Sequence, residues 1–263
     1  MLIFIKGAGD LATGVAWRLH NCGFQVVMTD IARPTAVRCT VAFSRAVYEG
    51  AAEIEGVTAR LARDPADALR ITGEGEIAVL VDPEAAAIET LRPPVVIDAV
   101  LAKRNLGTRI TDAPVVIALG PGFTAGADCH AVVETKRGHY LGRVIYAGSA
   151  IANTGVPGDI GGYTSERIIR APADGPFAPA ARIGQLVRAG DVGARVEGEP
   201  VRALIDGVVR GMLPEGTPVT RGMKSGDIDP RGIVEYCHTI SDKARAIAGG
   251  ALEAVLHLRG GVL

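Results

Sequence analysis

The beginning of the chain constrains its fold more than any other stretch. A short apolar run, Met1–Ile5, leads into the glycine-containing stretch IKGAGDLATG, and the residues up to Cys22 then follow the apolar rhythm of a helix. A buried strand, a glycine turn and a helix in this order form a cradle for phosphate groups. We therefore predict that the chain begins with a nucleotide-binding α/β unit.

The glycine turn fits the pattern G-x-G-x-x-G/A, with Gly7 and Gly9 in the first two positions and Ala12 in the third. Gly7 would permit the tight turn, Gly9 would let the backbone approach a pyrophosphate, and Ala12 would keep the helix close to the sheet. The pyrophosphate is expected on free amides at the helix start, which include that of Leu11. Asp30, which lies 21 residues after Gly9, is expected to hold a ribose hydroxyl. A tight turn without a ligand is the alternative.

Asp10 complicates this interpretation, because a carboxylate at the mouth of the cradle would repel a phosphate if it pointed inward. It either caps the helix or holds a metal ion bridged to the ligand. No metal ligand is assigned from the sequence. Lys103 and Arg104 either supply compensating positive charge or belong to a solvated loop.

Short apolar runs recur through the first half of the chain, with helical segments between them. Continuous Val, Ile and Leu runs favour parallel strands that are buried on both faces, and their alternation with helices predicts a doubly wound, Rossmann-like sheet. The predicted strands are Leu2–Ile5, Gln25–Met28, Ala78–Val81, Val95–Ile97 and Val115–Leu119. The predicted helices or helical turns are Leu11–Cys22, Ala36–Ala46, Ala66–Leu69 and Glu84–Leu91.

Acidic or glycine-rich residues follow each predicted strand, and in a parallel sheet these ends share the edge where ligands bind. Asp98 follows the fourth strand, and the stretch GPGFTAG follows the fifth. Gly120 and Gly122 flank a proline in a stiff turn whose amides suit an anion or an oxo group, and Gly126 ends that loop. Glu134, further on, is either a site carboxylate or an outward-facing strand residue.

The second half contains a hidden repeat at an offset of 32 residues. The matching pairs are Arg170 and Arg202, Ala171 and Ala203, Asp174 and Asp206, Gly175 and Gly207, Gly184 and Gly216, Val187 and Val219, and Gly190 and Gly222. Recurring Asp-Gly turns predict two interlocked all-β halves. The pattern resembles the barrel-sandwich fold of biotinyl and lipoyl carrier domains. The connecting hairpin, Glu197–Pro200, has no lysine, so a non-carrying relative is expected.

We therefore expect three parts: a Rossmann-like cofactor-binding domain at 1–165, a barrel-sandwich-hybrid domain at 166–232, and a C-terminal segment at 233–263. Ser241 or Asp242 would cap a helix in the last segment, and its small residues would allow close packing on the first domain.

Composition excludes several classes of protein. Of the 263 residues, 48% are hydrophobic and 22% are charged, and the net charge of −1 comes from interspersed residues. A packed core is therefore expected, and nucleic-acid binding is not. The first apolar run is too short for a signal peptide, and no run is long enough to cross a bilayer, so a cytoplasmic location is expected. Four widely spaced cysteines argue against disulfides and structural zinc.

Six stretches together resemble the YqeB-type proteins, which are accessory proteins of the selenium-dependent molybdenum hydroxylase system. They are IKGAGDLATGVAWRLH, PTAVRCTVAFSRAVYEG, DAVLAKRNLGT, ALGPGFTAGADCHAVVETKRGHYLGRVI, NTGVPGDIGGY and TISDKARAIAGGALEA. The fourth stretch is also similar to the factors that mature xanthine dehydrogenase by handling its molybdenum cofactor. The resemblance covers nearly the whole chain.

The resemblance implies a maturation role, with a molybdenum hydroxylase apo-enzyme as the partner. The expected ligand is a molybdopterin-type cofactor, which often ends in a dinucleotide, or an adenine nucleotide such as NAD(P). Cys39, near the expected edge site, would either relay sulfur or selenium as a thiolate or lie buried without a role. A homo-oligomer is also compatible with the sequence.

Two other functions remain open at this point, and the sequence leaves open whether the protein is an enzyme. One is an NAD(P)-dependent oxidoreductase of a small substrate, which would need an acid-base group such as Lys103 or His130. The other is a scaffold without chemistry that docks the hydroxylase through its β module.

Overall fold

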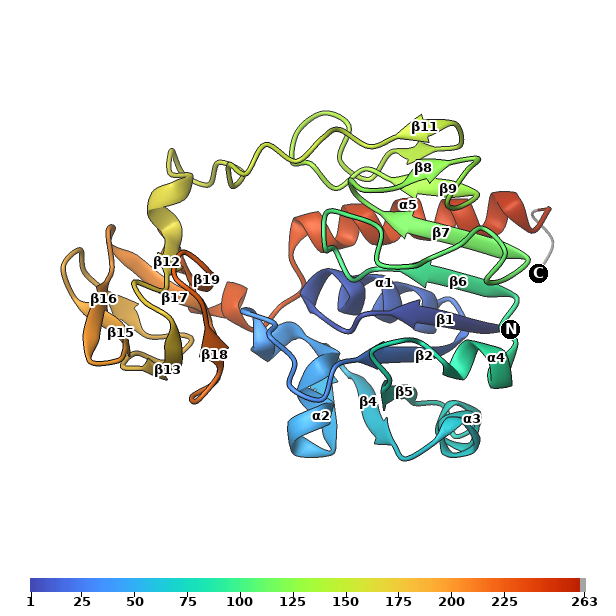
Figure 1. Ribbon diagram of the computed structural model, residues 1–263, viewed down its shortest axis with the longest axis horizontal. Helices are drawn as coiled ribbons and strands as arrows, with labels where there is room; N and C mark the ends of the chain where they lie inside the picture. The colour runs from blue at the N-terminus through green and yellow to red at the C-terminus, as the bar shows by residue number, and fades with distance from the viewer. Residues whose placement is uncertain (261–263) are drawn as a thin grey trace. The chain divides into compact units, whose positions relative to one another are not determined.

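A computed structural model describes residues 1–260 (Figure 1). The chain divides into two compact units. Unit 1 comprises Met1–Pro34, Ala42–Thr154 and the segment from Ile240 onward, and unit 2 comprises Thr35–Val41 and Gly155–Thr239. The boundaries expected from the sequence, after residues 165 and 232, both fall inside unit 2. The architecture is mixed α/β: a mostly parallel sheet, then small antiparallel sheets and a C-terminal helix.

Unit 1 is built on a nine-stranded sheet with the order β10-β9-β7-β6-β1-β2-β5-β4-β3. The strands from β9 to β4 pair in parallel, and β10 and β3 are attached antiparallel at the two ends. The strands are β1 (Leu2–Lys6), β2 (Gln25–Asp30), β3 (Ala51–Ile54), β4 (Val57–Ala62), β5 (Ile77–Val81), β6 (Val95–Asp98), β7 (Val115–Leu119), β9 (Ala131–Val133) and β10 (Val144–Ile145). A two-stranded ribbon joins β8 (Thr124–Ala125) to β11 (Gly148–Ser149).

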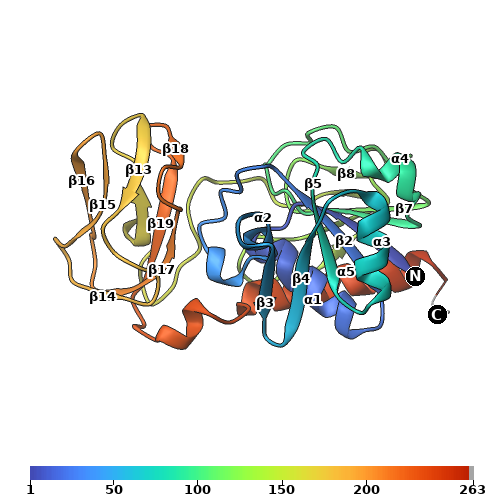
Figure 2. The ribbon, with the colours of Figure 1, turned by 90° about the horizontal axis from the view of Figure 1, so that it is seen from below.

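The central strands of this sheet are buried on both faces, which explains why they are almost entirely apolar. Successive residues point to opposite faces, so Ile3 and Ile5 enter one core while Phe4 enters the other. The first core includes residues of α1 (Asp10–Asn21), α2 (Ala46–Glu49) and α5 (Asp242–Leu258), and the second includes residues of α3 (Pro65–Gly73) and α4 (Ala87–Leu91). These helices can be followed in Figures 1 and 2.

The five predicted strands are all present, but one predicted helix is absent and several strands were not predicted. The stretch Ala36–Ala46 does not form one helix: it contains the 3-10 turns η1 (Cys39–Val41) and η2 (Phe43–Arg45). Its first part belongs to unit 2, where the Val37 carbonyl accepts a hydrogen bond from the Met212 amide at 2.8 Å. The hairpin of β3 and β4 was not predicted. Its turn uses positive φ at Glu55 and Gly56 (47° and 78°).

Helix α5 packs closely on the rest of unit 1. Ser241 caps it by accepting a hydrogen bond from the Ala244 amide at 3.2 Å. A Cβ on Gly14 of α1 would lie 2.7 Å from the Ala244 Cβ, and one on Gly142 would lie 2.5 Å from the Ala246 carbonyl oxygen. The small residues along α5 are therefore needed for this close approach.

Unit 2 contains two four-stranded antiparallel sheets, in the orders β12-β19-β17-β14 and β16-β15-β13-β18. The first consists of β12 (Ile168–Arg170), β19 (Lys224–Asp229), β17 (Gly207–Met212) and β14 (Leu186–Val187). The second consists of β16 (Glu199–Arg202), β15 (Val192–Val196), β13 (Gly175–Pro179) and β18 (Pro218–Val219). The 3-10 turns η3 (Ser165–Arg167) and η4 (Val234–Cys237) flank them.

The 32-residue repeat relates these two sheets strand by strand. The Gly190 amide donates to the Ala203 carbonyl, and the equivalent Gly222 amide donates to the Ala171 carbonyl, both at 2.8 Å. The paired strands of the interlocked halves also correspond, since β13 pairs with β18 as β17 pairs with β14. Each sheet therefore combines two strands from each half.

Candidate functional site

The candidate site lies at the carboxyl edge of the parallel sheet in unit 1, where β1 ends and α1 begins (Figure 1). Gly7 makes the turn with a φ of +92°, and its amide donates to the Thr29 carbonyl at 2.9 Å. A Cβ on Gly7 would lie 3.0 Å from the Ala99 carbonyl oxygen, so the loop after β6 packs directly against the turn. Both the backbone angle and this contact require glycine here.

Gly9 is the N-cap of α1 and differs from Gly7 in what surrounds it. Its φ is −67°, and a Cβ added there would meet no atom within 4 Å other than those of its neighbours in the chain. The first amides of a helix have no partner within the helix, and they carry partial positive charge. Gly9 therefore borders open space beside the donors of Leu11 and Ala12. Asp10 is the first residue of α1, so the cap position belongs to Gly9 and not to Asp10.

Asp30 joins the end of β2 to the glycine turn. One carboxylate oxygen accepts the Ala8 amide at 3.0 Å, and the other accepts the Ile31 amide at 2.8 Å. Burial raises the pKa of Asp30, and the two backbone hydrogen bonds partly offset that rise. Each carboxylate oxygen can accept a second hydrogen bond, so Asp30 can fix the turn and also bind a hydroxyl group.

A second polar network, between β1 and β6, was not predicted from the sequence. Lys6, at the end of β1, is aligned with Asp98 of β6. Its ammonium donates to the Thr108 hydroxyl at 2.9 Å and contacts Asp112 at 3.1 Å, and the Thr108 hydroxyl donates to Asp98 at 2.5 Å. The signal for Lys6 was available: it is the one charged residue in the apolar run before Gly7.

The second glycine loop packs tightly against neighbouring backbone. A Cβ on Gly122 would lie 2.6 Å from the Cα of Arg104 and 2.8 Å from the carbonyl carbon of Lys103. A Cβ on Gly120 would lie 2.5 Å from the Thr135 hydroxyl. Both glycines are therefore required by contacts within the protein, and their anion-binding role stays a prediction. The side chains of Lys103 and Arg104 are exposed.

The remaining predicted residues of this region have varied surroundings. Gly126 has a φ of +90° with nothing within 4 Å of an added Cβ. Glu134 is buried, and its two carboxylate oxygens accept the Lys136 and Ile151 amides at 2.7 and 2.8 Å, so it holds two backbone segments together. The Nδ1 atom of His130 accepts the Val116 amide at 2.9 Å, which leaves only Nε2 for acid-base chemistry.

The four cysteines are all reduced, and they are divided between the two units. Cys39 lies in unit 2, and Cys129 is buried in unit 1. Burial, with a smaller effect from Asp128, raises the pKa of Cys129 to about 12, so this thiol is protonated at neutral pH. Within residues 1–260, no three His, Cys, Asp or Glu side chains are grouped so that they could hold a metal ion. None of the helices in this range is long and apolar enough to cross a membrane.

Comparison with known proteins identifies one curated relative with a strong sequence match. The chain is 54% identical to the uncharacterized protein YqeB of Escherichia coli K12 over 257 residues. It is a YqeB homologue. The match covers 98% of this chain but 48% of that protein, so the chain spans about half the length of its relative. No protein-family model matches the sequence.

Solved structures give only distant likenesses. An aspartoacylase family protein from Mesorhizobium loti is 12% identical with a TM-score of 0.29, covering 86% of this chain and 84% of its own. A succinylglutamate desuccinylase/aspartoacylase from Rhodobacter sphaeroides is 14% identical with a TM-score of 0.28, covering 86% and 85%. The ectoine utilization protein EutE from Ruegeria pomeroyi is 22% identical with a TM-score of 0.23, covering 32% and 27%. TM-scores this low do not assign a common fold.

Proposed function

We propose that this YqeB homologue is an accessory protein that binds a molybdopterin-type or nucleotide cofactor during maturation of a selenium-dependent molybdenum hydroxylase. In this proposal unit 1 is a Rossmann-like, doubly wound cofactor-binding domain. Unit 2 is a barrel-sandwich hybrid without a carrier lysine, consistent with the hairpin Glu197-Gly198-Glu199-Pro200 between its halves. The apo-hydroxylase is the proposed partner.

The open space beside Gly9 is the main support for a bound phosphate-containing ligand. The N-terminus of a 12-residue helix borders that space, and helix N-termini bind phosphate through their free amides and dipole. Other glycines at this edge, such as Gly7 and Gly122, are tightly packed against protein atoms, whereas Gly9 is not. A glycine without a packing or backbone requirement at this position suits close approach of a ligand.

Different residues around the space would bind different parts of the ligand. The amides of Leu11 and Ala12 would hold a phosphate group, and Asp30 would bind a hydroxyl of the attached sugar. Lys6, near the same edge, is paired with Asp112, so the helix amides rather than this lysine would supply the attraction for an anionic ligand. A molybdopterin-type cofactor, when bound, supplies the metal centre that a hydroxylase requires. In this proposal the chain's own residues orient the cofactor and perform no hydride transfer.

Calorimetric titration of the full chain with ADP and with a pterin dinucleotide tests this proposal. Gly9→Val should weaken binding at least about tenfold, because the added side chain occupies the space beside the helix amides. Gly73→Val is the matched control: Gly73 ends α3, and an added Cβ also meets nothing within 4 Å. Equal affinities for the two variants, or a parent chain that binds neither ligand, would contradict the proposal.

An activity screen separates this proposal from the oxidoreductase alternative. Purified protein should give no sustained NAD(P)H oxidation or NAD(P)⁺ reduction with a panel of small alcohols, aldehydes and hydroxy acids. Steady turnover that is lost in Gly9→Val would favour the oxidoreductase instead.

A further inference from the structure

The loop after β6, residues 99–112, borders the candidate site of unit 1. Strand β6 is parallel to β1, so this loop leaves the sheet at the edge where α1 begins. A Cβ on Gly7 would lie 3.0 Å from the Ala99 carbonyl oxygen, at the start of the loop. A Cβ on Gly122 would lie 2.6 Å from the Cα of Arg104, further along it. The loop therefore packs against both the glycine turn and the second glycine loop.

Side-chain hydrogen bonds fix the conformation of this loop. The side-chain oxygen of Asn105 accepts the amides of Gly107 and Thr108 at 2.9 and 2.8 Å, and its nitrogen donates to the Thr108 carbonyl at 2.8 Å. The Thr108 hydroxyl in turn donates to Asp98 at the end of β6. The loop is therefore held to the sheet edge by its own side chains.

The backbone of the loop is strained at two positions. Leu101 and Lys103 have φ angles of 60° and 62°. Residues with a Cβ rarely adopt such angles, and asparagine tolerates them better than lysine or leucine. Strained residues persist where the surrounding structure holds them, and they cluster at sites that bind ligands. The strain at Lys103 therefore points to a role for this loop at the candidate site.

The loop also carries two adjacent positive charges without protein partners. The side chains of Lys103 and Arg104 are exposed, and neither makes a hydrogen bond or an ion pair within residues 1–260. Asp112 is the one carboxylate in the sequence of the loop, and it is paired with Lys6 at 3.1 Å. The charges of Lys103 and Arg104 are therefore free to attract an anion.

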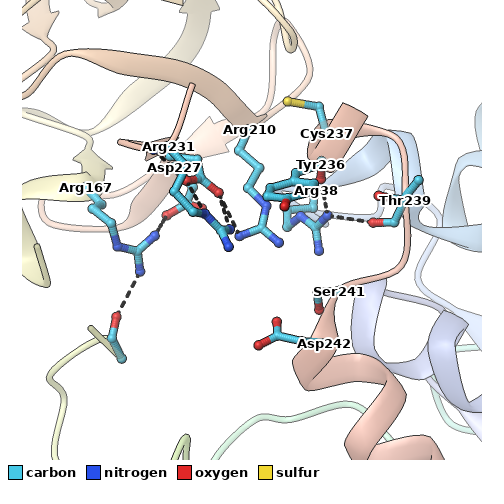
Figure 3. A network of polar contacts seen from close by, with 12 residues as sticks. Arg38, Arg167, Arg210, Asp227, Arg231, Tyr236, Cys237, Thr239, Ser241 and Asp242 are labelled. Carbon is cyan, nitrogen blue, oxygen red and sulfur yellow. Dashed lines mark hydrogen bonds and ion pairs between the residues drawn. The ribbon is translucent and has the colours of Figure 1, made fainter. Parts of the chain in front are cut away.

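The arginines shown in Figure 3, from unit 2, illustrate the contrast. Arg167 donates to Asp227 at 2.8 Å, and Arg38 donates to the Tyr236 carbonyl at 3.0 Å (Figure 3). Contacts of this kind explain a cation through the stability of the fold. Lys103 combines a free charge with a strained backbone, and neither feature stabilises the fold.

We propose that Lys103 and Arg104 bind a second phosphate group of the ligand whose first phosphate lies on the amides of α1. This inference rests on the function proposed above, because it requires a ligand beside Gly9. Lysine and arginine bind phosphate oxygens through charged N–H donors. The ligand class is therefore one with two linked phosphates, such as a nucleoside diphosphate or a dinucleotide, and a monophosphate would lack half of the binding site.

The length of the loop is compatible with this assignment. Four residues separate Lys103 from Ala99, which packs on Gly7, and four extended residues span at most about 14 Å. Lys103 therefore lies within reach of a ligand that extends from the glycine turn toward β7.

Titration of the full chain with ADP and with AMP tests the proposal. The parent chain should bind ADP at least about tenfold more tightly than AMP. Lys103→Asn removes the charge with a residue that tolerates positive φ, so it should weaken ADP binding about tenfold and leave AMP binding unchanged. Arg104→Gln should shift the preference in the same direction, and Lys103→Arg should keep it.

Arg92→Asn is the matched control. Arg92 is also exposed and has a φ of 44°, but it ends α4 three residues before β6 begins, at the opposite edge of the sheet. Both asparagine substitutions should raise the melting temperature, because both relieve strain. Only Lys103→Asn should lose the preference for ADP.

The outcomes separate this inference from the function on which it rests. Equal affinities of the parent chain for ADP and AMP would overturn the inference, as would an unchanged preference in Lys103→Asn, and both would leave the site beside Gly9 intact. Titration with the pterin dinucleotide, which also carries two linked phosphates, should show the same loss in Lys103→Asn. A parent chain that binds none of the three ligands would overturn both proposals.

Discussion

The two halves of unit 2, residues 167–198 and 199–230, share one framework but differ in what they bury. Asp174 accepts the Arg221 amide at 2.6 Å, and its counterpart Asp206 accepts the Ala189 amide at 2.7 Å. Arg170 donates to the Gly222 carbonyl at 2.9 Å, and Arg202 donates to the Gly190 carbonyl at 2.7 Å. The turns thus repeat bond for bond.

The strand faces do not repeat. Asp229 is fully buried in contact with two arginines, Arg210 and Arg231, whereas its counterpart Glu197 is exposed at the hairpin. The turns therefore have the same hydrogen bonds in both halves, while only the second half contains the buried ion pairs of Asp229. The comparison separates what the fold needs, namely turns and small apolar core residues, from what has been added to it.

Removing the buried carboxylate should have the largest effect. Asp229→Ala is expected to lower the free energy of unfolding by about 3–5 kcal/mol, because Arg210 would remain buried without its carboxylate. Glu197→Ala, at the equivalent exposed position, should change it by less than about 0.5 kcal/mol. Urea denaturation of both variants measures the difference. Similar losses for the two would show that the halves are energetically alike.

Substitutions at the equivalent glycines Gly175 and Gly207 should have the next largest effects on stability. Gly207 has a φ of +158°, and a Cβ there would collide with the Asp229 carbonyl oxygen, which is backbone and cannot move aside. At Gly175 the obstacle is the Glu197 carboxylate, 2.7 Å away, and this side chain can turn into solvent. Gly207→Ala should therefore cost about 3 kcal/mol and Gly175→Ala about 1 kcal/mol. Thermal unfolding that ranks them in the opposite order would refute this reasoning.

Lowering the pH should reduce the contribution of Asp229 to the free energy of unfolding, and with it the energetic difference between the two halves. Burial acts to raise the pKa of Asp229, but hydrogen bonds and charge from Arg231 outweigh it, so the pKa lies below its ordinary value. Its stabilising contribution is present above the unfolded pKa of about 3.9 and is lost as the pH falls below it. The stability gap between the parent chain and Asp229→Ala should therefore narrow from pH 7 to pH 3. A difference in stability that grows as the pH falls would contradict the lowered pKa of Asp229.

The smallest effects should be equal in the two halves. Asp174→Ala and Asp206→Ala each remove one backbone hydrogen bond at an exposed turn, so each should cost about 1 kcal/mol. Equal midpoints in urea support equivalent turns. Clearly different urea midpoints for the two variants would show that the two turns are not energetically equivalent.

Periodicity predicted much of this fold from the sequence. Continuous apolar runs such as Val115–Leu119 indicated parallel strands, and matched glycines and aspartates revealed the repeat of unit 2. The hairpin of β3 and β4 was missed because its strands are short and contain alanine, glutamate and arginine. The segment Thr35–Val41 was misassigned because its partner strand lies far away in the sequence.

The candidate sites were less predictable. The glycine turn and Asp30 follow a local pattern, so the sequence indicated both. Lys6 and Thr108 are 102 residues apart, and Arg38 bonds to the Tyr236 carbonyl 198 residues away. Contacts at such separations depend on the assembled fold and leave no local spacing to read.

The placement of α5 has a consequence for synthesis of the protein. The apolar face that Ile247, Ala251 and Val255 cover belongs to unit 1, whose strands all lie before residue 150. Domains generally fold as units while the chain emerges from the ribosome. All of Gly155–Thr239 must therefore leave the ribosome before the first unit receives its last helix. During that interval the face of unit 1 that α5 will cover is exposed.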